Sequence, residues 1–226
     1  MATREARTLR QPRRRPGRRS IEAGRREILD AAVAFLGERP FRALTVGRLM
    51  ERAGIGRSAF YFYFRDVYQV AEALLREVQQ EIIDAAMPWI EGRGKPADNL
   101  REMLARGSAI WARRGPMLRG ISDAAPLDAR LEGVFREIVG RLDQAIAAVI
   151  RREQAADRMG ALDPDETGIA LNQLNLAYLN DRLGRSPQAD PARVAETLER
   201  IWIRTLYHGR DDDAPIPRTP GKETAA

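Results

Sequence analysis

The sequence predicts an all-α protein, with a small N-terminal domain of three helices and a larger helical domain after it. Apolar residues recur every three or four positions along most of the chain, as they do on one face of a helix. Residue types that start or end helices stand at the limits of these stretches. No segment alternates apolar and polar residues in the manner of a strand. These three observations indicate helices and no sheet.

The first two helices are bounded by recognisable start and stop residues. Gly37 and Pro40 end the first helix, and Thr45 is a suitable N-cap for a short second one. Gly54 can end that second helix in the left-handed conformation that glycine adopts without strain. The apolar positions of these helices are Ile28, Ala32, Phe35, Leu36, Val46, Leu49, Met50 and Ala53.

A third short helical segment, Arg57 to Phe64, is expected directly after this glycine turn. Asp66 can cap a fourth helix, and Pro88 is expected to end it. The apolar stripe of the fourth helix consists of Val67, Val70, Ala71, Leu74, Val78 and Ile82.

Glycine and proline mark a boundary or hinge between residues 92 and 96. The next helix begins near residue 100, and Gly115-Pro116 is expected to close it. A short helix is then expected from Pro116 to about Ala124.

Three further helices are expected in the C-terminal part of the chain. Their approximate limits are 128–156, 164–183 and 191–207. The second has a cap at Asp163 and a proline at its first helical position, and the third begins at Asp190-Pro191. Residues 210–226 are expected to form a flexible polar tail.

Composition excludes several classes of site. The 226 residues include no cysteine and one histidine, His208, which excludes disulfides, thiolate metal sites, cysteine nucleophiles and sites with two imidazoles. Neither a metal nor a cofactor is expected. No apolar stretch reaches the length of a membrane span, and the N-terminus lacks the apolar core of a secretory signal. The protein is therefore expected to be cytoplasmic, without a membrane partner.

Positive charge is concentrated at the N-terminus. The net charge is +6, and residues 1–26 hold ten arginines against two glutamates, so the rest of the chain is close to neutral. Pro12, Pro16 and Gly17 interrupt the segment, and residues 1–22 are expected to form a disordered arginine-rich arm. Such an arm suits DNA, because each neutralised phosphate releases counterions. The alternative is a solvated tail; an anionic membrane surface fits less well, because the arm has no apolar face.

Residues 45–64 have the spacing of a helix-turn-helix, in which the second helix lies in the major groove of DNA. Phe60 and Phe64 are one turn apart and can face inward to hold this helix on a small core. The residues left on the outward side are Arg57, Ser58, Tyr61 and Tyr63. Their side chains can donate hydrogen bonds to bases or phosphates. The alternative is that the aromatic run serves the core alone.

The segment resembles the DNA-binding module of the TetR family of transcriptional regulators, and the resemblance extends over residues 25–75. The positions that match the family's pattern are Thr45, Leu49, Ala53, Gly54, Ile55, Phe60, Tyr61, Tyr63 and Phe64. The resemblance implies that the tyrosines contact phosphates and that the start of the recognition helix reads bases. The residues that it assigns to DNA are Thr45, Gly56, Arg57, Ser58, Ala59, Tyr61, Tyr63 and Arg65.

Three positions depart from the family's pattern. Gly56 replaces a serine cap, and Ala59 replaces a threonine and so removes one hydroxyl. Val67 stands where the family has a lysine that touches a phosphate. Either Arg65 compensates for that lysine, or part of the affinity shifts to the N-terminal arm.

Three segments of the chain together resemble the EthR-like branch of the family, the ethionamide-resistance regulators. The similarity rests on residues 60–64, 170–175 and 201–202. In that branch an apolar channel runs through the C-terminal domain, which implies a lipophilic small-molecule effector. The residues that the resemblance assigns to ligand binding are Met103, Trp111, Phe135, Val139, Leu142, Asn172, Asn175 and Trp202.

The positions of Asn172 and Asn175 independently make them candidates for ligand contact. They lie three residues apart on an otherwise apolar helix, so both project from one side. A buried amide needs hydrogen-bond partners, which the polar group of a ligand would supply. The alternatives are bonds to neighbouring backbone or contacts across a dimer interface. For Trp111 and Trp202 the alternative is ordinary core packing.

The resemblance further implies a homodimer, formed through the helices at about 164–183 and 191–207, that binds a pseudo-palindromic operator in double-stranded DNA. The expected function is a repressor that a lipophilic ligand releases from DNA. The alternative is an architectural DNA-binding protein held by its arm, without effector control. No nucleophile and base are paired in the pattern, so enzymatic activity is not expected. The expected domain limits are 1–22 (arm), 23–66 (helix-turn-helix), 67–209 (effector binding and dimerisation) and 210–226 (tail).

Overall fold

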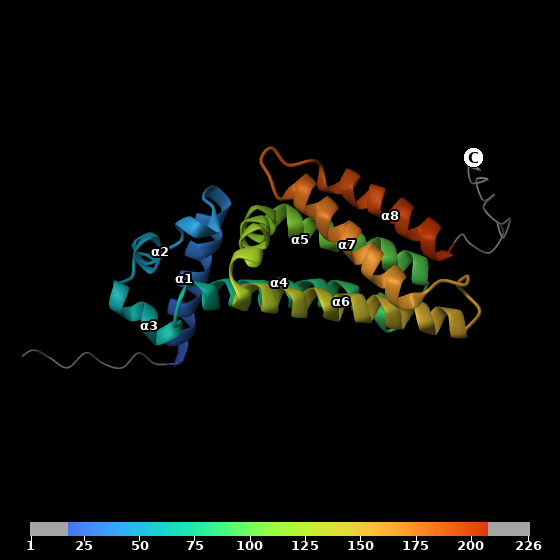
Figure 1. The fold of residues 1–226 in the computed structure, drawn as a ribbon, viewed down its shortest axis with the longest axis horizontal. Coiled ribbons are helices and arrows are strands. Elements are labelled where there is room, and N and C mark those ends of the chain that lie inside the picture. The colour runs from blue at the N-terminus through green and yellow to red at the C-terminus, as the bar shows by residue number, and fades with distance from the viewer. Residues whose placement is uncertain (1–17, 208–226) are drawn as a thin grey trace, which may run out of the picture.

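Figure 1 shows the protein as a computed structural model, which describes residues 18–207. Over these residues the chain is all-α, as the sequence predicts, with eight α-helices, three 3₁₀ helices and no strand. The elements in chain order are α1 (Arg18–Glu38), η1 (Phe41–Ala43), α2 (Val46–Ala53), η2 (Arg57–Ala59), α3 (Phe60–Tyr63), α4 (Val67–Ile90), α5 (Pro96–Ala124), η3 (Ala125–Leu127), α6 (Ala129–Ala155), α7 (Pro164–Leu183) and α8 (Pro191–Tyr207).

The elements form a small head, which comprises α1–α3 with η1 and η2, and an elongated body, which comprises α4–α8 with η3 (Figure 1). Helix α4 leaves the head directly after α3 and runs along the body beside α6. Helix α5 packs against α1 as well as against α4, α7 and α8. One hydrophobic core therefore continues from the head into the body.

The caps that the sequence predicts are confirmed. Thr45 accepts a hydrogen bond from the Arg48 N–H, and Gly54 ends α2 with a φ of 69°. Asp66 accepts from the Gln69 N–H at the start of α4. At α7, the Oδ1 of Asp163 accepts from the N–H groups of residues 165 and 166, both at 3.0 Å. Each cap satisfies backbone donors that a helix leaves open at its first turn.

The first helix starts earlier than the sequence prediction, which placed no packed structure before about residue 22. Helix α1 begins at Arg18, directly after the Pro16-Gly17 pair in the sequence. Proline and glycine thus mark the start of the helix more closely than the first apolar residue does. Residues 1–17 and 208–226, which contain most of the predicted arm, His208 and the predicted tail, lie outside the described residues.

Pro88 does not end α4, contrary to the sequence prediction, since the helix continues to Ile90. The residue after the proline, Trp89, is buried, and its Nε1 donates to the Tyr207 hydroxyl at 3.0 Å. Its ring also meets Trp202 edge-on, with centroids 5.9 Å apart. These contacts hold the last turn of α4 on α8 although Pro88 lacks an N–H.

The prediction that Gly115-Pro116 closes a helix is also wrong, because α5 runs through both residues to Ala124. A proline in a helix leaves the carbonyl four residues earlier without its usual donor. Here the Nε2 of Gln188 donates to that carbonyl, Ala112 O, at 3.1 Å. Gly115 permits a close approach of another helix, because a Cβ at this position would lie 2.1 Å from the carbonyl oxygen of Leu183.

Candidate functional site

The helix-turn-helix of the head is built as the sequence predicts, with one refinement. After Gly54, the Ile55 N–H donates to Met50 O at 3.1 Å and turns the chain sharply out of α2. The third segment, residues 57–64, starts as the 3₁₀ turn η2 and continues as one turn of α-helix, α3. The two helices of the motif are thus joined by a short, hydrogen-bonded turn.

Two phenylalanines fix this segment on the head, which confirms the inward orientation predicted for them. Phe60 and Phe64 are both buried, and their ring centroids lie 5.9 Å apart. The guanidinium carbon of Arg25, on α1, stands 5.3 Å from the centre of the Phe64 ring. Such a position over an aromatic face is favourable for a cation. The recognition segment therefore packs against α1 on its buried side.

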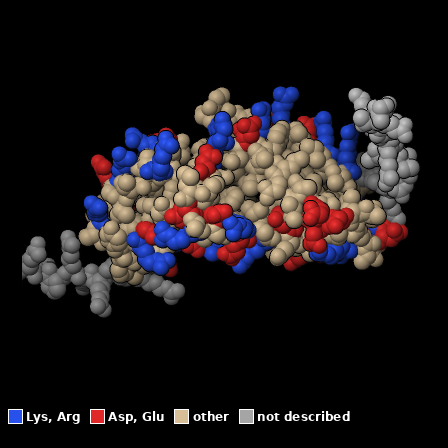
Figure 2. Space-filling model, in the orientation of Figure 1, with Lys and Arg blue, Asp and Glu red and all other residues tan. Residues whose placement is uncertain are grey.

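The opposite side of the segment faces outward. Tyr61 is 62% exposed. The other predicted DNA contacts that are exposed are Thr45, Gly56, Arg57, Ser58 and Arg65, whereas Ala59 is half-buried. Figure 2 shows several basic side chains at this end of the molecule, with acidic ones among them. We call the exposed ones among the predicted residues, Thr45, Gly56, Arg57, Ser58, Tyr61 and Arg65, the reading surface.

The sequence analysis placed Tyr63 on the outward side, but in the structure this side chain is only partly exposed. Its side chain is half-buried and lies against α1. A Cβ placed on Gly24 would come within 2.4 Å of the Tyr63 hydroxyl oxygen, so glycine leaves the room that this ring occupies. The exposed aromatic that sequence reasoning missed is Phe62, which is 62% exposed. The sequence signal for its exposure was its place two residues from each of the inward-facing Phe60 and Phe64.

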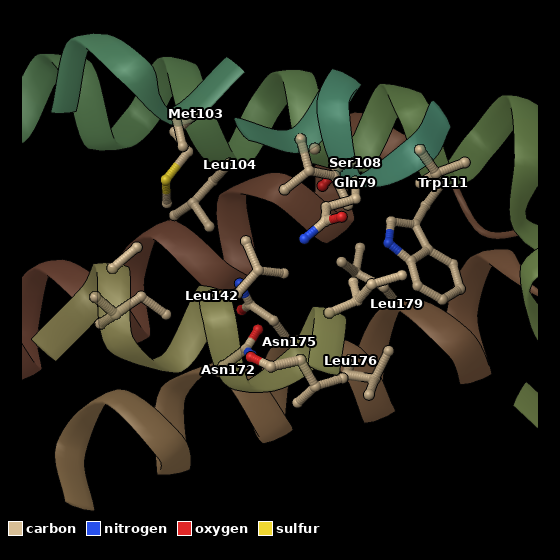
Figure 3. A pocket seen from close by; sticks show the side chains of 18 of the residues that line it. Gln79, Met103, Leu104, Ser108, Trp111, Leu142, Asn172, Asn175, Leu176 and Leu179 are labelled. Carbon is tan, nitrogen blue, oxygen red and sulfur yellow. The ribbon is translucent and has the colours of Figure 1, made fainter. Parts of the chain in front are cut away.

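The body contains a cavity of about 140 Å³ between α4, α5, α6, α7 and α8 (Figure 3). The eight residues that the sequence analysis assigned to a ligand all lie in its wall. They are Met103, Trp111, Phe135, Val139, Leu142, Asn172, Asn175 and Trp202. All three tryptophans of the chain, including Trp89, line the same cavity.

The wall of the cavity is mostly apolar, and none of the described residues that line it is charged. Leucine, isoleucine and valine side chains from five helices make up about half of it. A site of this kind favours neutral, apolar molecules, because a charged ligand would lose its hydration without gaining a partner.

The two asparagines are each partly engaged by protein groups. The Nδ2 of Asn172 donates to Asp143 Oδ1 at 2.7 Å and to Val139 O at 3.3 Å. The Oδ1 of Asn175 accepts from Trp202 Nε1 at 2.9 Å. In the described part of the chain, the Nδ2 of Asn175 forms no hydrogen bond, so this amide donor is available to a ligand.

Two further polar residues of the wall were missed by sequence reasoning. Gln79 on α4 and Ser108 on α5 line the cavity and are buried. Gln79 Nε2 and Ser108 Oγ have no hydrogen-bond partner within residues 18–207. The signal for Gln79 was available, since it interrupts the apolar stripe of its helix between Val78 and Ile82 in the same way as the asparagines interrupt theirs.

An ion pair joins the start of α4 to the start of α6, close to the head. Arg130 donates to the Asp66 carboxylate at 2.8 Å, and its guanidinium carbon lies 4.7 Å from the centre of the Tyr68 ring. Burial opposes ionisation of Asp66, but hydrogen bonds from the Gln69 N–H and from Arg130 outweigh it and lower the pKa of this carboxyl. Because α6 also supplies Phe135 to the cavity wall, the pair joins a helix of that wall to the N-cap of α4, next to the head.

Within residues 18–207 no cluster of three or more acidic or histidine side chains has the arrangement of a metal site. No helix in this range is long and apolar enough to cross a membrane.

Comparisons with known proteins agree with this arrangement. The family model described as "Bacterial regulatory proteins, tetR family" matches residues 28–74. The HTH-type transcriptional regulator EthR of Mycobacterium tuberculosis is 30% identical to the chain over 203 residues, which cover 86% of this chain and 92% of EthR.

Solved structures share the fold. SmeT, described as the repressor of the Stenotrophomonas maltophilia multidrug efflux pump SmeDEF, superposes with a TM-score of 0.67 at 18% identity, over 88% of this chain and 96% of SmeT. FadR of Bacillus halodurans, described as a fatty acid degradation regulator, reaches a TM-score of 0.70 at 13% identity, over 79% of this chain and 93% of FadR.

Proposed function

Because the chain belongs to the TetR family of bacterial transcriptional regulators, near its EthR branch, we propose that it is a repressor controlled by a small molecule. Membership in the family makes it a DNA-binding regulator of transcription and not an enzyme. The proposal adds that a homodimer binds a palindromic operator and leaves it when a lipophilic molecule occupies the cavity. Since its partner is chromosomal DNA, we place its action in the cytoplasm.

The reading surface is proposed to bind the operator. Arg57 and Ser58 stand exposed at the start of the recognition segment, where they are suited to base edges in the major groove. Tyr61 and Arg65 are suited to the phosphates on either side. Gly56 and Ala59 allow the backbone to come close, and Tyr63 is proposed to reach a phosphate from its half-buried position.

Thr45 is proposed to act through the backbone. Its Oγ1 accepts from the Arg48 N–H and is therefore committed to the cap of α2. The cap orients the first turn of α2, whose N-terminus can then face a phosphate of the DNA backbone. Residues 23–66 are proposed as the DNA-binding domain on these grounds, and residues 67–209 as the domain for effector and partner.

The observation that carries effector control is the mostly apolar, uncharged cavity lined in part by α4, the helix that continues from the recognition segment. A ligand that widens this cavity must displace at least one of the five helices that line it, α4 to α8. Displacement of α4 would move the head. A movement of α6 would be transmitted to the start of α4 through the Asp66–Arg130 ion pair. Ligand and DNA would then select different states of one equilibrium.

Dimerisation through α7 and α8 is supported by apolar side chains that these helices leave exposed. Ile169 on α7 is 42% exposed and Ile201 on α8 is 37% exposed. An exposed apolar surface on two neighbouring helices is suited to an interface with a second copy. The two-fold axis of such a dimer would place one head on each half of a palindromic operator, with about 34–36 Å or a multiple between their centres.

The test is release of DNA by small molecules. The full-length protein is bound to a duplex taken from the DNA upstream of its own gene, and neutral lipophilic compounds are added while DNA binding and tryptophan fluorescence are both recorded. We expect every compound that changes the fluorescence strongly to weaken DNA binding as well. Compounds that change the fluorescence and leave the affinity for DNA unaltered would contradict effector control.

A further inference from the structure

Gln79 and Ser108 are buried polar residues, and each has a side-chain atom that no group among the described residues satisfies. Gln79 is 7% exposed and Ser108 is 1% exposed. Within residues 18–207, three buried side-chain polar atoms have no hydrogen-bond partner, and two of them are Gln79 Nε2 and Ser108 Oγ. Buried groups of this kind are rare in folded proteins, because an unmade hydrogen bond in the interior is unfavourable. The presence of two such atoms therefore points to a hydrogen-bond partner that is not part of the chain.

Both residues belong to the wall of the cavity. Gln79 comes from α4 and Ser108 from α5, two helices that pack against each other. Figure 3 shows the Gln79 amide reaching from this wall into the cavity, with Asn172 and Asn175 on the opposite wall. The cavity thus has a polar group on each side and apolar surface between them.

The chemistry of this wall limits the ligand. An amide N–H and a hydroxyl can both donate a hydrogen bond, so an acceptor atom is the complementary group. No charged residue among those described lines the cavity to balance a charged ligand. The fitting partner is therefore uncharged, with one acceptor oxygen next to apolar surface.

We propose that Gln79 and Ser108 form a polar subsite that binds the carbonyl oxygen of a small neutral effector. The inference rests on the proposed function, in which the cavity is the effector site. The subsite is distinct from the two asparagines, whose amides are already bonded in part to Val139, Asp143 and Trp202. It also gives the effector a direct bond to α4, the helix that leads to the recognition segment.

The experiment uses two probes of nearly equal shape, cyclohexanone and methylenecyclohexane, which differ in a carbonyl oxygen against a CH₂ group. Their six-membered rings suit a cavity of about 140 Å³, since a cavity of about 150 Å³ can hold benzene. Binding to the full-length protein is followed by tryptophan fluorescence, because all three tryptophans line the cavity. The variants are Gln79→Met and Ser108→Ala, with Gln80→Met and Ser122→Ala as controls on the same helices outside the cavity.

The expected result is a preference of about fivefold or more for the ketone in the wild type, as one added hydrogen bond would give. Gln79→Met and Ser108→Ala should each reduce this preference, and both should leave the affinity for methylenecyclohexane within about twofold. The control variants should keep the full preference. Binding of both probes with equal affinity, or a preference that survives both cavity variants, overturns the subsite and leaves the proposed function standing. If neither probe binds, the subsite and effector control are overturned together.

The melting temperature of the ligand-free protein gives a second readout. Gln79→Met and Ser108→Ala each remove a buried polar atom without a partner, so both variants should melt at the wild-type temperature or above it. A structural role for these side chains would instead lower the melting temperature. Such a decrease in both variants, with no loss of ketone preference, overturns the proposal.

Discussion

At the scale of single residues, the recognition segment divides its aromatic side chains between two tasks. Phe60 and Phe64 are buried in the head and keep the segment in place. Tyr61 and Phe62 are largely exposed on the other side, next to Arg57 and Ser58. The spacing of one helical turn between the two phenylalanines produces this division, since residues at i and i+4 share a face.

Replacement of the exposed residues tests this division directly. Arg57→Ala should weaken operator binding about fivefold to hundredfold, because a good contact to a base edge is worth about 1–3 kcal/mol. Tyr61→Phe removes one hydroxyl and should weaken binding about twofold to tenfold, from about 0.5–1.5 kcal/mol for a hydrogen bond. Affinity is measured by fluorescence anisotropy at one salt concentration, because phosphate contacts are sensitive to salt.

Arg193→Ala serves as the control, since it removes the same charge from α8, far along the chain from the head. It should leave operator binding near the wild-type value. Unchanged binding in both Arg57→Ala and Tyr61→Phe would show that the reading surface is wrongly placed.

The sequence predicted the inward phenylalanines because their spacing alone defines a face. It did not predict the position of Tyr63, since that depends on Gly24 of α1, which leaves the room for the ring. Sequence analysis did not identify Gln79 and Ser108, for a related reason. A polar residue in an apolar stripe is a signal in the sequence, but only the structure shows that its side chain is buried without a partner among residues 18–207.

At the scale of elements, the capped starts of helices could be predicted from the sequence, whereas helix breaks at proline could not. Caps such as Asp66 and Asp163 were predictable, because a side-chain acceptor and the N–H groups it satisfies are neighbours in sequence. The continuity of α5 through Gly115-Pro116 was not, because it depends on residues far along the chain. Gln188 satisfies the carbonyl that Pro116 leaves open, and α7 ends against Gly115.

Gly115→Ala tests the explanation given for that glycine. Its Cβ would lie 2.1 Å from the backbone oxygen of Leu183, so α5 and α7 must move apart. Overpacking of this kind typically costs about 1–3 kcal/mol of the free energy of unfolding. Urea denaturation should record this loss as a lower midpoint.

Gly133→Ala is the matched control on α6, where nothing lies within 4 Å of the added Cβ. It should raise stability by up to about 1 kcal/mol, because alanine favours a helix more than glycine does. Equal effects of the two substitutions would contradict the close approach of α5 and α7.

Glu153 gives the far end of the body a dependence on pH. This carboxyl is buried, and hydrogen bonds from Arg158, together with those from Arg152, lower its pKa although burial opposes them. A lowered pKa in the folded state stabilises the fold above the ordinary pKa of 4.5, and this contribution is lost as the pH falls below that value.

Glu153→Gln should therefore lower the melting temperature at pH 7, and the difference from the wild type should shrink as the pH falls from about 5 toward 3. Glu102→Gln is the control, because its pair with Arg106 is exposed and should contribute little at any pH. A difference between Glu153→Gln and the wild type that is constant across this range would contradict the assignment.

At the scale of the whole molecule, head and body share one core and are joined by α4. The sequence predicted both parts and eight of the residues that line the cavity. It did not predict the link between them, because Asp66 and Arg130 are distant in sequence and meet only when α4 and α6 pack side by side. The proposed coupling between the two parts therefore depends on a contact that exists only in the folded molecule.

Arg130→Ala should weaken that coupling. Asp66 would keep its cap on α4, but α6 would lose its ionic contact with the start of that helix. The ligand should still bind, and its effect on operator affinity should fall several-fold, within the range of about 1–3 kcal/mol typical of coupled sites. Arg136→Ala, which removes only a pair within α6, should leave the effect intact. A full response in Arg130→Ala would exclude this route.

The most direct test of the account is selection of DNA by the full-length protein from a pool of random duplexes, followed by footprinting of the selected site. The account predicts a two-fold symmetric sequence, whose half-sites lie about 34–36 Å or a multiple of that distance apart, with loss of selection in Arg57→Ala. Recovery of sequences without symmetry, or the same site selected by Arg57→Ala, would contradict it.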